Sequence, residues 1–269
     1  HYFFNTCFIN IVEEPEQNLY PQSQNKVLYE LLECKNNREE KTLREVQIQT
    51  GVNLYAEGSC LITCGNTKVL CTASVDDKLP AWLKGSDKGW VTAEYSLLPR
   101  STQTRVSRET KGVSGRTHEI QRLIGRSLRS VTDLYALKDY MILIDCDVLQ
   151  ADGGTRTASI TGSFVALYMA LEKLKKEGKV QKNPIKEFVA AVSCGLDGDK
   201  VLLDLDYDED SSARADTNFV ITESGRIVEI QGTAEEEPFE QDKFFELFET
   251  AKDGIKELIE KQKQALGIK

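Results

Sequence analysis

Two short stretches of the chain carry residue types that can hold an anion and act on it. The first follows a strand-like run and reads Gly153-Gly154-Thr155-Arg156. Paired glycines let a backbone approach a ligand closely, and a helix that begins directly after them presents unpaired N–H groups and the positive end of its dipole. The Thr155 hydroxyl adds a donor, and the Arg156 guanidinium can grip two phosphate oxygens. Taken alone, the pattern is more typical of an ordinary strand-to-helix turn with a surface arginine, so the anion site needs support from the rest of the chain.

The second stretch, residues 208–218, is rich in carboxylates. Asp210 ends its acidic run, whereas Asp216 and Asn218 lie two residues apart on an expected strand, where alternate side chains share a face. Mg²⁺ takes oxygen ligands from few residues and keeps several waters, so two aspartates at the mouth of a strand suit this ion. The stretch is compatible with a metal site on Asp210 and Asp216. Taken alone, it is more typical of a hairpin loop whose charges are solvated.

A third feature is a concentration of positive charge. The chain carries a net charge of −9, yet residues 100–129 hold eight basic and two acidic side chains, a local +6 that leaves −15 elsewhere. Such a strip on an acidic body can guide a polyanion to one place, while a solvated helix face is the simpler interpretation. Within the strip, Arg100, Arg105 and Arg108 fall in an expected polar loop. A helix is expected from about Thr117 to Leu134, with Arg116 just ahead of it.

On that expected helix, Arg122, Arg126 and Arg129 share one side at i, i+4 and i+7, opposite its apolar residues. The helix after the paired glycines shows one apolar stripe, formed by Ile160, Phe164, Leu167, Leu171 and Leu174. Such a stripe anchors the helix to a core, so its first turn can be held still.

The elements that must position these residues alternate between strands and helices. Apolar runs on both sides of Gly65-Asn66 predict a hairpin, and strands are expected at 188–193, 201–207, 216–222 and 227–231. An amphipathic helix closes the chain. Strands followed by helices, twice over, predict a layered α+β (α/β) domain.

Composition narrows the function classes. Seven cysteines without a CxxC pair indicate reduced, buried thiols in a cytosol-like compartment, and two histidines make a zinc site or a Ser-His-Asp triad improbable. No apolar run is long enough to span a membrane, and the first 25 residues lack the basic residues of a leader. A cytoplasmic location without a membrane partner is therefore expected.

Six ordered blocks together resemble the bacterial ribonuclease PH family. They are GNTKVLCTASV (65–75), GWVTAEYSLLPR (89–100), SGRTHEIQRLIGRSLRSV (114–131), IDCDVLQADGGTRTASITG (144–162), LLDLDYDEDSS (202–212) and GRIVEIQGTAEEEPF (225–239). Long blocks in a fixed order are far more specific than a single motif. The resemblance covers residues 38–269 as one ribonuclease PH domain and leaves 1–37 as an atypical N-terminal segment.

The resemblance implies the family's βαβα fold, related to the second domain of ribosomal protein S5. It also implies a phosphate-dependent 3′-to-5′ exoribonuclease, or tRNA nucleotidyltransferase, that trims tRNA precursors and is linked to rRNA processing, assembled as a homo-hexamer of three dimers. Three sets of site residues follow from it. Phosphate would be bound by Arg116, Gly154, Thr155 and Arg156. Mg²⁺ would be bound by Asp210 and Asp216, which would also act in catalysis together with Arg116 and Arg156. RNA would be bound by Arg100, Arg105 and Arg108.

Two positions depart from the family pattern. The family's Arg-x-Asp-Gly-Arg opening is matched here only by Arg38. Arg214 stands between the two aspartates, where the family commonly carries an acidic or neutral residue, and the sequence does not decide between a local ion pair and a modest loss of metal affinity. Two other functions stay open. One is a non-catalytic ring subunit that binds RNA, as in exosome relatives of this fold, and the weaker one is an enzyme that acts on nucleotides alone.

Overall fold

The computed structural model describes residues 38–110, 112–235 and 237–268, so the segment expected to be atypical, 1–37, lies outside the described residues. From Glu40 onward the described chain forms one compact unit. This unit holds two sheets and four α-helices, which agrees with the predicted layered α+β class. No helix in the described ranges is both long and apolar enough to cross a membrane.

The first sheet has five strands in the order β1-β2-β3-β5-β4, and only β4 and β5 run parallel. The helix α2 (Gly115–Ser130) makes the crossover between that parallel pair. The predicted hairpin is confirmed, because Cys64 pairs with Thr67 across Gly65-Asn66 and Gly65 adopts a φ of 55°. The elements are β1 (Val46–Thr50), β2 (Gly58–Cys64), β3 (Thr67–Asp76), the 3₁₀ turn η1 (Ala81–Leu83), β4 (Trp90–Leu97) and β5 (Met141–Gln150).

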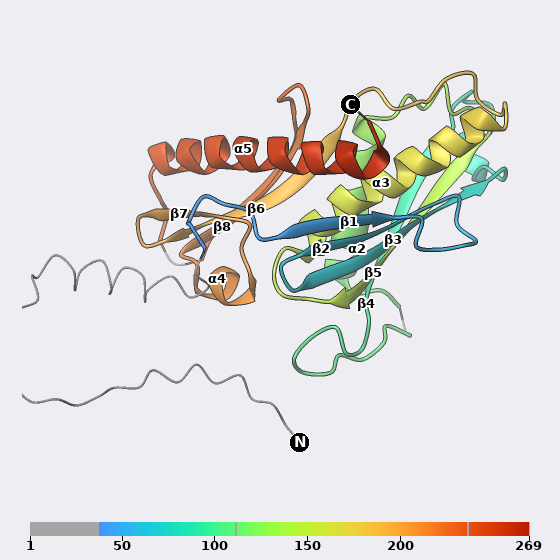
Figure 1. The fold of residues 1–269 in the computed structure, drawn as a ribbon. Coiled ribbons are helices and arrows are strands. Elements are labelled where there is room, and N and C mark those ends of the chain that lie inside the picture. Colours follow the sequence, from blue (N-terminus) through green and yellow to red (C-terminus); the bar gives the residue numbers. More distant parts are fainter. Residues whose placement is uncertain (1–37, 111, 236, 269) are drawn as a thin grey trace, which may run out of the picture. The chain divides into compact units, whose positions relative to one another are not determined.

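The second sheet has four antiparallel strands in the order β7-β6-β8-β9. Figure 1 shows α5 lying along this sheet, and the ring of Phe219 on β8 packs against those of Phe244 and Phe248 on α5. The elements are β6 (Val189–Asp197), β7 (Lys200–Leu203), α4 (Tyr207–Ser212), β8 (Ala215–Thr222), β9 (Ile227–Ala234) and α5 (Gln241–Leu266).

The helix α3 (Thr155–Lys176) is the centre of the unit and contacts both sheets. Its predicted stripe is buried, but burial extends around the helix and includes Ser159, Thr161 and Ser163. The single-stripe prediction was therefore too narrow. Small residues on the remaining sides allow close packing: a Cβ at Gly162 would lie 2.8 Å from Ile62 of β2. Burial on several sides fixes the first turn of α3 in place.

Two predicted boundaries were wrong. α2 begins at Gly115 rather than Thr117, because the Ser114 hydroxyl accepts the Thr117 N–H at 3.2 Å as an N-cap. The helix ends at Ser130 because the chain then pairs with the segment before β6, where the Asp133 N–H donates to the Pro184 carbonyl at 2.7 Å. Arg116 therefore lies inside the first turn of α2 rather than ahead of it.

The acidic stretch 208–212, expected to be a loop, is the short helix α4. A capping box forms it: the Asp206 carboxylate accepts the Glu209 N–H at 2.9 Å, and the Glu209 carboxylate accepts the Asp206 N–H at 3.0 Å. The strand expected to reach residue 207 consequently stops at Leu203.

Candidate functional site

A pocket of about 910 Å³ opens where α2, α3 and α4 meet β8 and β9. Both predicted arginines, Arg116 and Arg156, and both predicted aspartates, Asp210 and Asp216, line it. The remaining lining residues are Glu119, Ser211, Ser212, Ala213, Asn218, Ile230, Gln231, Gly232, Thr233 and Glu235. Residues up to 119 positions apart in sequence, Arg116 and Glu235, therefore line one polar cavity, and in it the two guanidinium groups lie with the carboxylates of Asp210 and Asp216.

Strand pairing builds the floor of this pocket. β8 pairs with β9 so that Asp216 lies opposite Thr233 and Asn218 opposite Gln231. These side chains share one face of the sheet, as the alternation in sequence predicts, while the residues between them on β8 are buried. Asp210 reaches the pocket from α4, which the Asp206 cap holds next to β8.

Arg156 is held in place by neutral and acidic acceptors. Its Nη1 donates to Gln231 Oε1 at 2.8 Å and to Glu119 Oε1 at 3.2 Å. Neither Glu119 nor Gln231 was predicted from the sequence to have a role. A signal for Glu119 was present, because it lies three residues after Arg116 on the same face of α2.

The paired glycines adopt the left-handed conformation that their residue type permits, with φ of 70° at Gly153 and 62° at Gly154. Gly154 is the N-cap of α3, and the Thr155 hydroxyl that follows lies 2.9 Å from the hydroxyl of buried Tyr95. Neither Gly154 nor Thr155 lines the pocket; they set the start of the helix that carries Arg156.

The expected role of Gly153 was to let the backbone approach a ligand closely, but in the structure its close neighbour is another segment of the chain. A Cβ at Gly153 would lie 2.4 Å from the Leu205 carbonyl oxygen and 2.5 Å from the Asp206 carbonyl carbon. Close approach at this glycine therefore serves another segment of the chain, the one that leads into α4.

In the pocket, the positive charge of the arginines opposes the effect of burial on the pKa of the aspartates. Burial raises the pKa of Asp210, and the nearby Arg156 and Arg116 guanidinium groups oppose that rise. The pKa of Asp216 is raised by burial and by the negative charges of Asp210 and Glu235. Like-charged carboxylates at one mouth favour a cation between them.

The donor set suits one kind of metal ion. In the described ranges no cluster of three or more His, Cys, Asp or Glu side chains forms a metal cage. Mg²⁺ is commonly held by one or two carboxylates, waters and substrate phosphates rather than by a complete protein cage. Asp210 and Asp216 fit that arrangement. Arg214 does not line the pocket, and within the described chain it forms no ion pair with either aspartate.

The other basic residues divide into two groups. Arg100, Arg105 and Arg108 are exposed on the connection between β4 and α2 and lie outside the pocket. Arg122 and Arg126 line an adjoining hollow between α2 and β9.

Arg129, predicted on the same side of α2 as Arg122 and Arg126, is half-buried and does not line that hollow. Its Nη1 donates to the Val91 carbonyl at 2.8 Å, and its guanidinium lies 4.5 Å from the Trp90 ring centroid.

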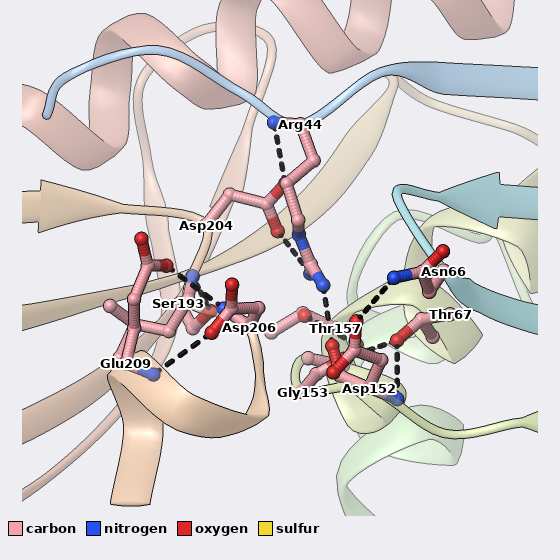
Figure 2. Close-up of polar contacts among 12 residues, drawn as sticks. Arg44, Asn66, Thr67, Asp152, Gly153, Thr157, Ser193, Asp204, Asp206 and Glu209 are labelled. Carbon is pink, nitrogen blue, oxygen red and sulfur yellow. Dashed lines mark hydrogen bonds and ion pairs between the residues drawn. The ribbon is translucent and has the colours of Figure 1, made fainter. Parts of the chain in front are cut away.

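Sequence reasoning also missed a buried ion pair beside the site. Arg44, just before β1, pairs with Asp204, and both side chains are less than a tenth exposed. Figure 2 shows this pair next to the turn at Asp152 and Gly153. Nothing in local sequence spacing joins residues 44 and 204, because only the fold brings them together.

Models of two domains of one protein family match this chain. Residues 42–171 match the model of domain 1 of the 3′ exoribonuclease family, and residues 187–254 match domain 2. Ribonuclease PH of Methylobacterium nodulans is 55% identical over 234 residues, covering 86% of this chain and 99% of that protein. Ribonuclease PH of Rhodospirillum rubrum is 58% identical over 227 residues, covering 84% and 95% respectively.

Among solved structures, the Archaeoglobus fulgidus exosome with RNA bound to the active site aligns with a TM-score of 0.71 at 21% identity. That alignment covers 88% of this chain and 96% of the exosome chain, and it supports the fold alone. With two family domains in order and more than half of the aligned residues shared with two relatives, the chain belongs to the ribonuclease PH group of the 3′ exoribonuclease family.

Proposed function

We propose that the protein is a phosphate-dependent 3′-to-5′ exoribonuclease, a tRNA nucleotidyltransferase that shortens RNA 3′ ends and releases nucleoside 5′-diphosphates. The observation that carries the proposal is the shared pocket, which is lined by Arg116, Arg156, Asp210 and Asp216 in a chain of this family. A non-catalytic ring subunit is not favoured, because both halves of the pocket are present.

Arg116 and Arg156 hold the attacking phosphate. Two anions must come into contact during phosphorolysis, and fixed positive charge offsets their repulsion. An oxygen of orthophosphate forms a bond to the phosphorus of the terminal phosphodiester, and the bond from that phosphorus to the 3′ oxygen of the preceding nucleotide breaks. The leaving oxygen takes the proton that hydrogen phosphate loses when this bond forms, so the products are a nucleoside 5′-diphosphate and a shortened RNA with a free 3′ hydroxyl.

Asp210 and Asp216 are the residues that would hold Mg²⁺ in this pocket. A bound Mg²⁺ supplies positive charge that stabilises the developing negative charge of phosphoryl transfer. Phosphate is already an anionic nucleophile near neutral pH, so the site needs no strong general base. The scarcity of histidine in the chain fits that requirement.

The RNA body lies outside the pocket. Arg100, Arg105 and Arg108 are exposed on the connection that leads into α2, whose first turn carries Arg116. Their charge would guide the 3′ end of a tRNA precursor toward the cavity, since phosphate contacts position a nucleic acid without reading its sequence. The same property suits rRNA ends.

We further propose a homo-hexamer built as a trimer of dimers, working in the cytoplasm. The family resemblance supports the assembly. The location is supported by the five described cysteines, all free and buried. The native mass of the particle tests the assembly, since a monomer or an isolated dimer would contradict it.

Product analysis tests the activity. An RNA with a 3′ extension, incubated with Mg²⁺, should release nucleoside diphosphates only when phosphate is added, and should release none with Arg156→Ala. Nucleoside monophosphates formed equally well without phosphate would identify a hydrolase and overturn the proposal.

A further inference from the structure

The buried side chain of Arg44 joins three segments of the chain. Its Nε and Nη2 donate to the two Asp204 carboxylate oxygens at 3.0 and 2.7 Å, and its backbone N–H donates to the same carboxylate at 3.0 Å. Its remaining nitrogen, Nη1, donates to the Asp152 carbonyl at 2.6 Å. The guanidinium thus binds Asp204 through Nε and Nη2 and binds the turn that precedes α3 through Nη1.

A second set of bonds holds the same turn from β3. The Asp152 N–H donates to Thr67 Oγ1 at 2.9 Å, and the Thr67 hydroxyl donates to the Gly153 carbonyl at 2.6 Å. The Asp152 carboxylate accepts Asn66 Nδ2 at 3.0 Å and the N–H of Tyr207, the first residue of α4, at 3.4 Å. Figure 2 shows Asp152 between Thr67 and Arg44.

The turn and the entry to α4 are also in direct contact. Gly153 lies so close to Leu205 and Asp206 that no side chain would fit at its position. Asp204 begins this entry with a φ of 59°, and its N–H donates to the Ser193 carbonyl at 2.7 Å. Asp206 then caps the helix that carries Asp210. One group of contacts therefore fixes the segments that bear Arg156 and Asp210.

We propose that Arg44, Thr67, Asp152 and Asp204 form a positioning clamp that sets the separation between the phosphate-holding start of α3 and the aspartate-bearing helix α4. The inference rests on the proposed function for its catalytic readout. None of the four residues lines the pocket, so the clamp acts through Gly153, Arg156 and Asp210 rather than on substrate. Phosphoryl transfer depends on alignment, and a small displacement between the two halves is costly to rate.

A stabilising pair and a positioning clamp differ in what their removal does. A buried ion pair replaced as a whole is often neutral for stability, whereas removal of one partner leaves an uncompensated charge. The informative variant is therefore the double change Arg44→Met/Asp204→Asn. Asparagine tolerates the left-handed conformation at 204 and keeps an acceptor for the backbone N–H of residue 44. Thr67→Val tests the other side of the turn without touching the ion pair.

The matched control is Thr132→Val. The Thr132 hydroxyl is also buried and donates to a carbonyl, that of Leu128 at 2.7 Å, at the far end of α2 from Arg116. Three readouts are compared at equal temperature below each melting point: the phosphate KM and kcat with one RNA, the RNA Kd, and hydrogen exchange of residues 152–156 and 207–212.

The clamp predicts that the double variant loses about 10–100-fold in kcat/KM for phosphate at unchanged RNA Kd. Exchange should quicken in both segments together, and Thr67→Val should change both readouts in the same direction, while Thr132→Val changes neither.

Wild-type phosphate KM and kcat in folded Arg44→Met/Asp204→Asn, or faster exchange confined to 152–156 in Thr67→Val, would overturn the clamp. Should the wild-type protein itself release no diphosphates, the proposed function fails, and the exchange comparison still decides the clamp.

Discussion

Arg156, the proposed phosphate-binding side chain, is already oriented in this structure. Gln231 and Glu119 both accept from its Nη1, which holds the guanidinium in the pocket. Such preorganisation reduces the entropy that binding costs, because the long side chain is already ordered. For a single side chain such as Arg156, the geometry of the guanidinium donor matters as much as its charge.

Replacing Arg156 by lysine separates those two contributions. Arg156→Lys keeps one positive charge but loses the planar fork that can hold two phosphate oxygens. The loss of one charge-assisted bond, about 1.5–3 kcal/mol, corresponds to a phosphate KM raised by roughly 10–100-fold. Steady-state kinetics with phosphate varied measure it. Arg226→Lys, on the turn between β8 and β9, is the control, and an equal rise there would point to general disturbance.

The two pocket aspartates should affect turnover more than RNA binding. Asp210→Asn and Asp216→Asn keep side-chain size and remove the charge that would hold the metal, so kcat should fall by on the order of 10²–10³-fold. RNA binding, measured by fluorescence anisotropy, should stay within about threefold, since the RNA phosphate contacts proposed outside the pocket would dominate it. Asp253→Asn on α5 provides the control. Full activity of Asp210→Asn would remove this carboxylate from the mechanism.

The buried cysteines should resist alkylation. Burial raises the pKa of the Cys60 and Cys64 thiols to about 12, so both stay protonated near pH 8, where the reactive thiolate is absent. Iodoacetamide followed by site-resolved mass spectrometry should modify neither residue in the native protein and both after denaturation. Rapid native modification at pH 8 would show that these strands open readily.

Among the elements, the turn before α3 restricts the residue type at position 153 to glycine. Gly153→Ala and Gly178→Ala provide a matched pair, because the two glycines have φ of 70° and 73°, but only Gly153 has neighbours within 4 Å. The left-handed conformation alone costs an alanine roughly 1 kcal/mol, which both variants share. Crowding by the entry to α4 should add about 1–3 kcal/mol to Gly153→Ala.

Chemical denaturation measures that difference, and phosphate kinetics should change only in Gly153→Ala. Equal losses in the two variants would mean that the turn and the entry to α4 do not press on each other.

The sequence predicted what depends on local periodicity. The Gly65-Asn66 hairpin, the shared face of Asp216 and Asn218 and the helix after Gly154 are short-range consequences of alternation and turn chemistry. α4 was missed because a capping box inside an acidic run reads equally well as a solvated loop.

Long-range contacts explain the other misses. Arg129 lies against β4, where the Val91 carbonyl accepts its Nη1 and the Trp90 ring lies beside its guanidinium. Arg44 pairs with Asp204, which is 160 residues away in the sequence. No periodicity in a single chain encodes such pairs. The convergence of Arg116, Arg156, Asp210 and Asp216 was predicted through the family resemblance rather than through spacing.

Over the whole chain, positive charge is concentrated in the basic strip, residues 100–129, and the remainder is acidic. Removing three strip charges with Arg100→Ala/Arg105→Ala/Arg108→Ala should weaken RNA binding and reduce the slope of log K against log salt by up to about 2, because each single-strand phosphate that an arginine neutralises contributes roughly 0.7 to that slope. Titrations at several salt concentrations measure the slope. An unchanged slope would place the RNA elsewhere, and the phosphate KM should stay constant in either case.

In phosphorolysis, orthophosphate itself becomes part of the product. ³²P-labelled orthophosphate, supplied with unlabelled RNA and Mg²⁺ and followed by chromatography, tests this directly. Label should appear in the β-phosphate of the released nucleoside diphosphates, and it should be lost with Arg156→Ala and with Asp210→Asn. Shortened RNA with no label in any nucleotide would show that water, not phosphate, had broken the bond.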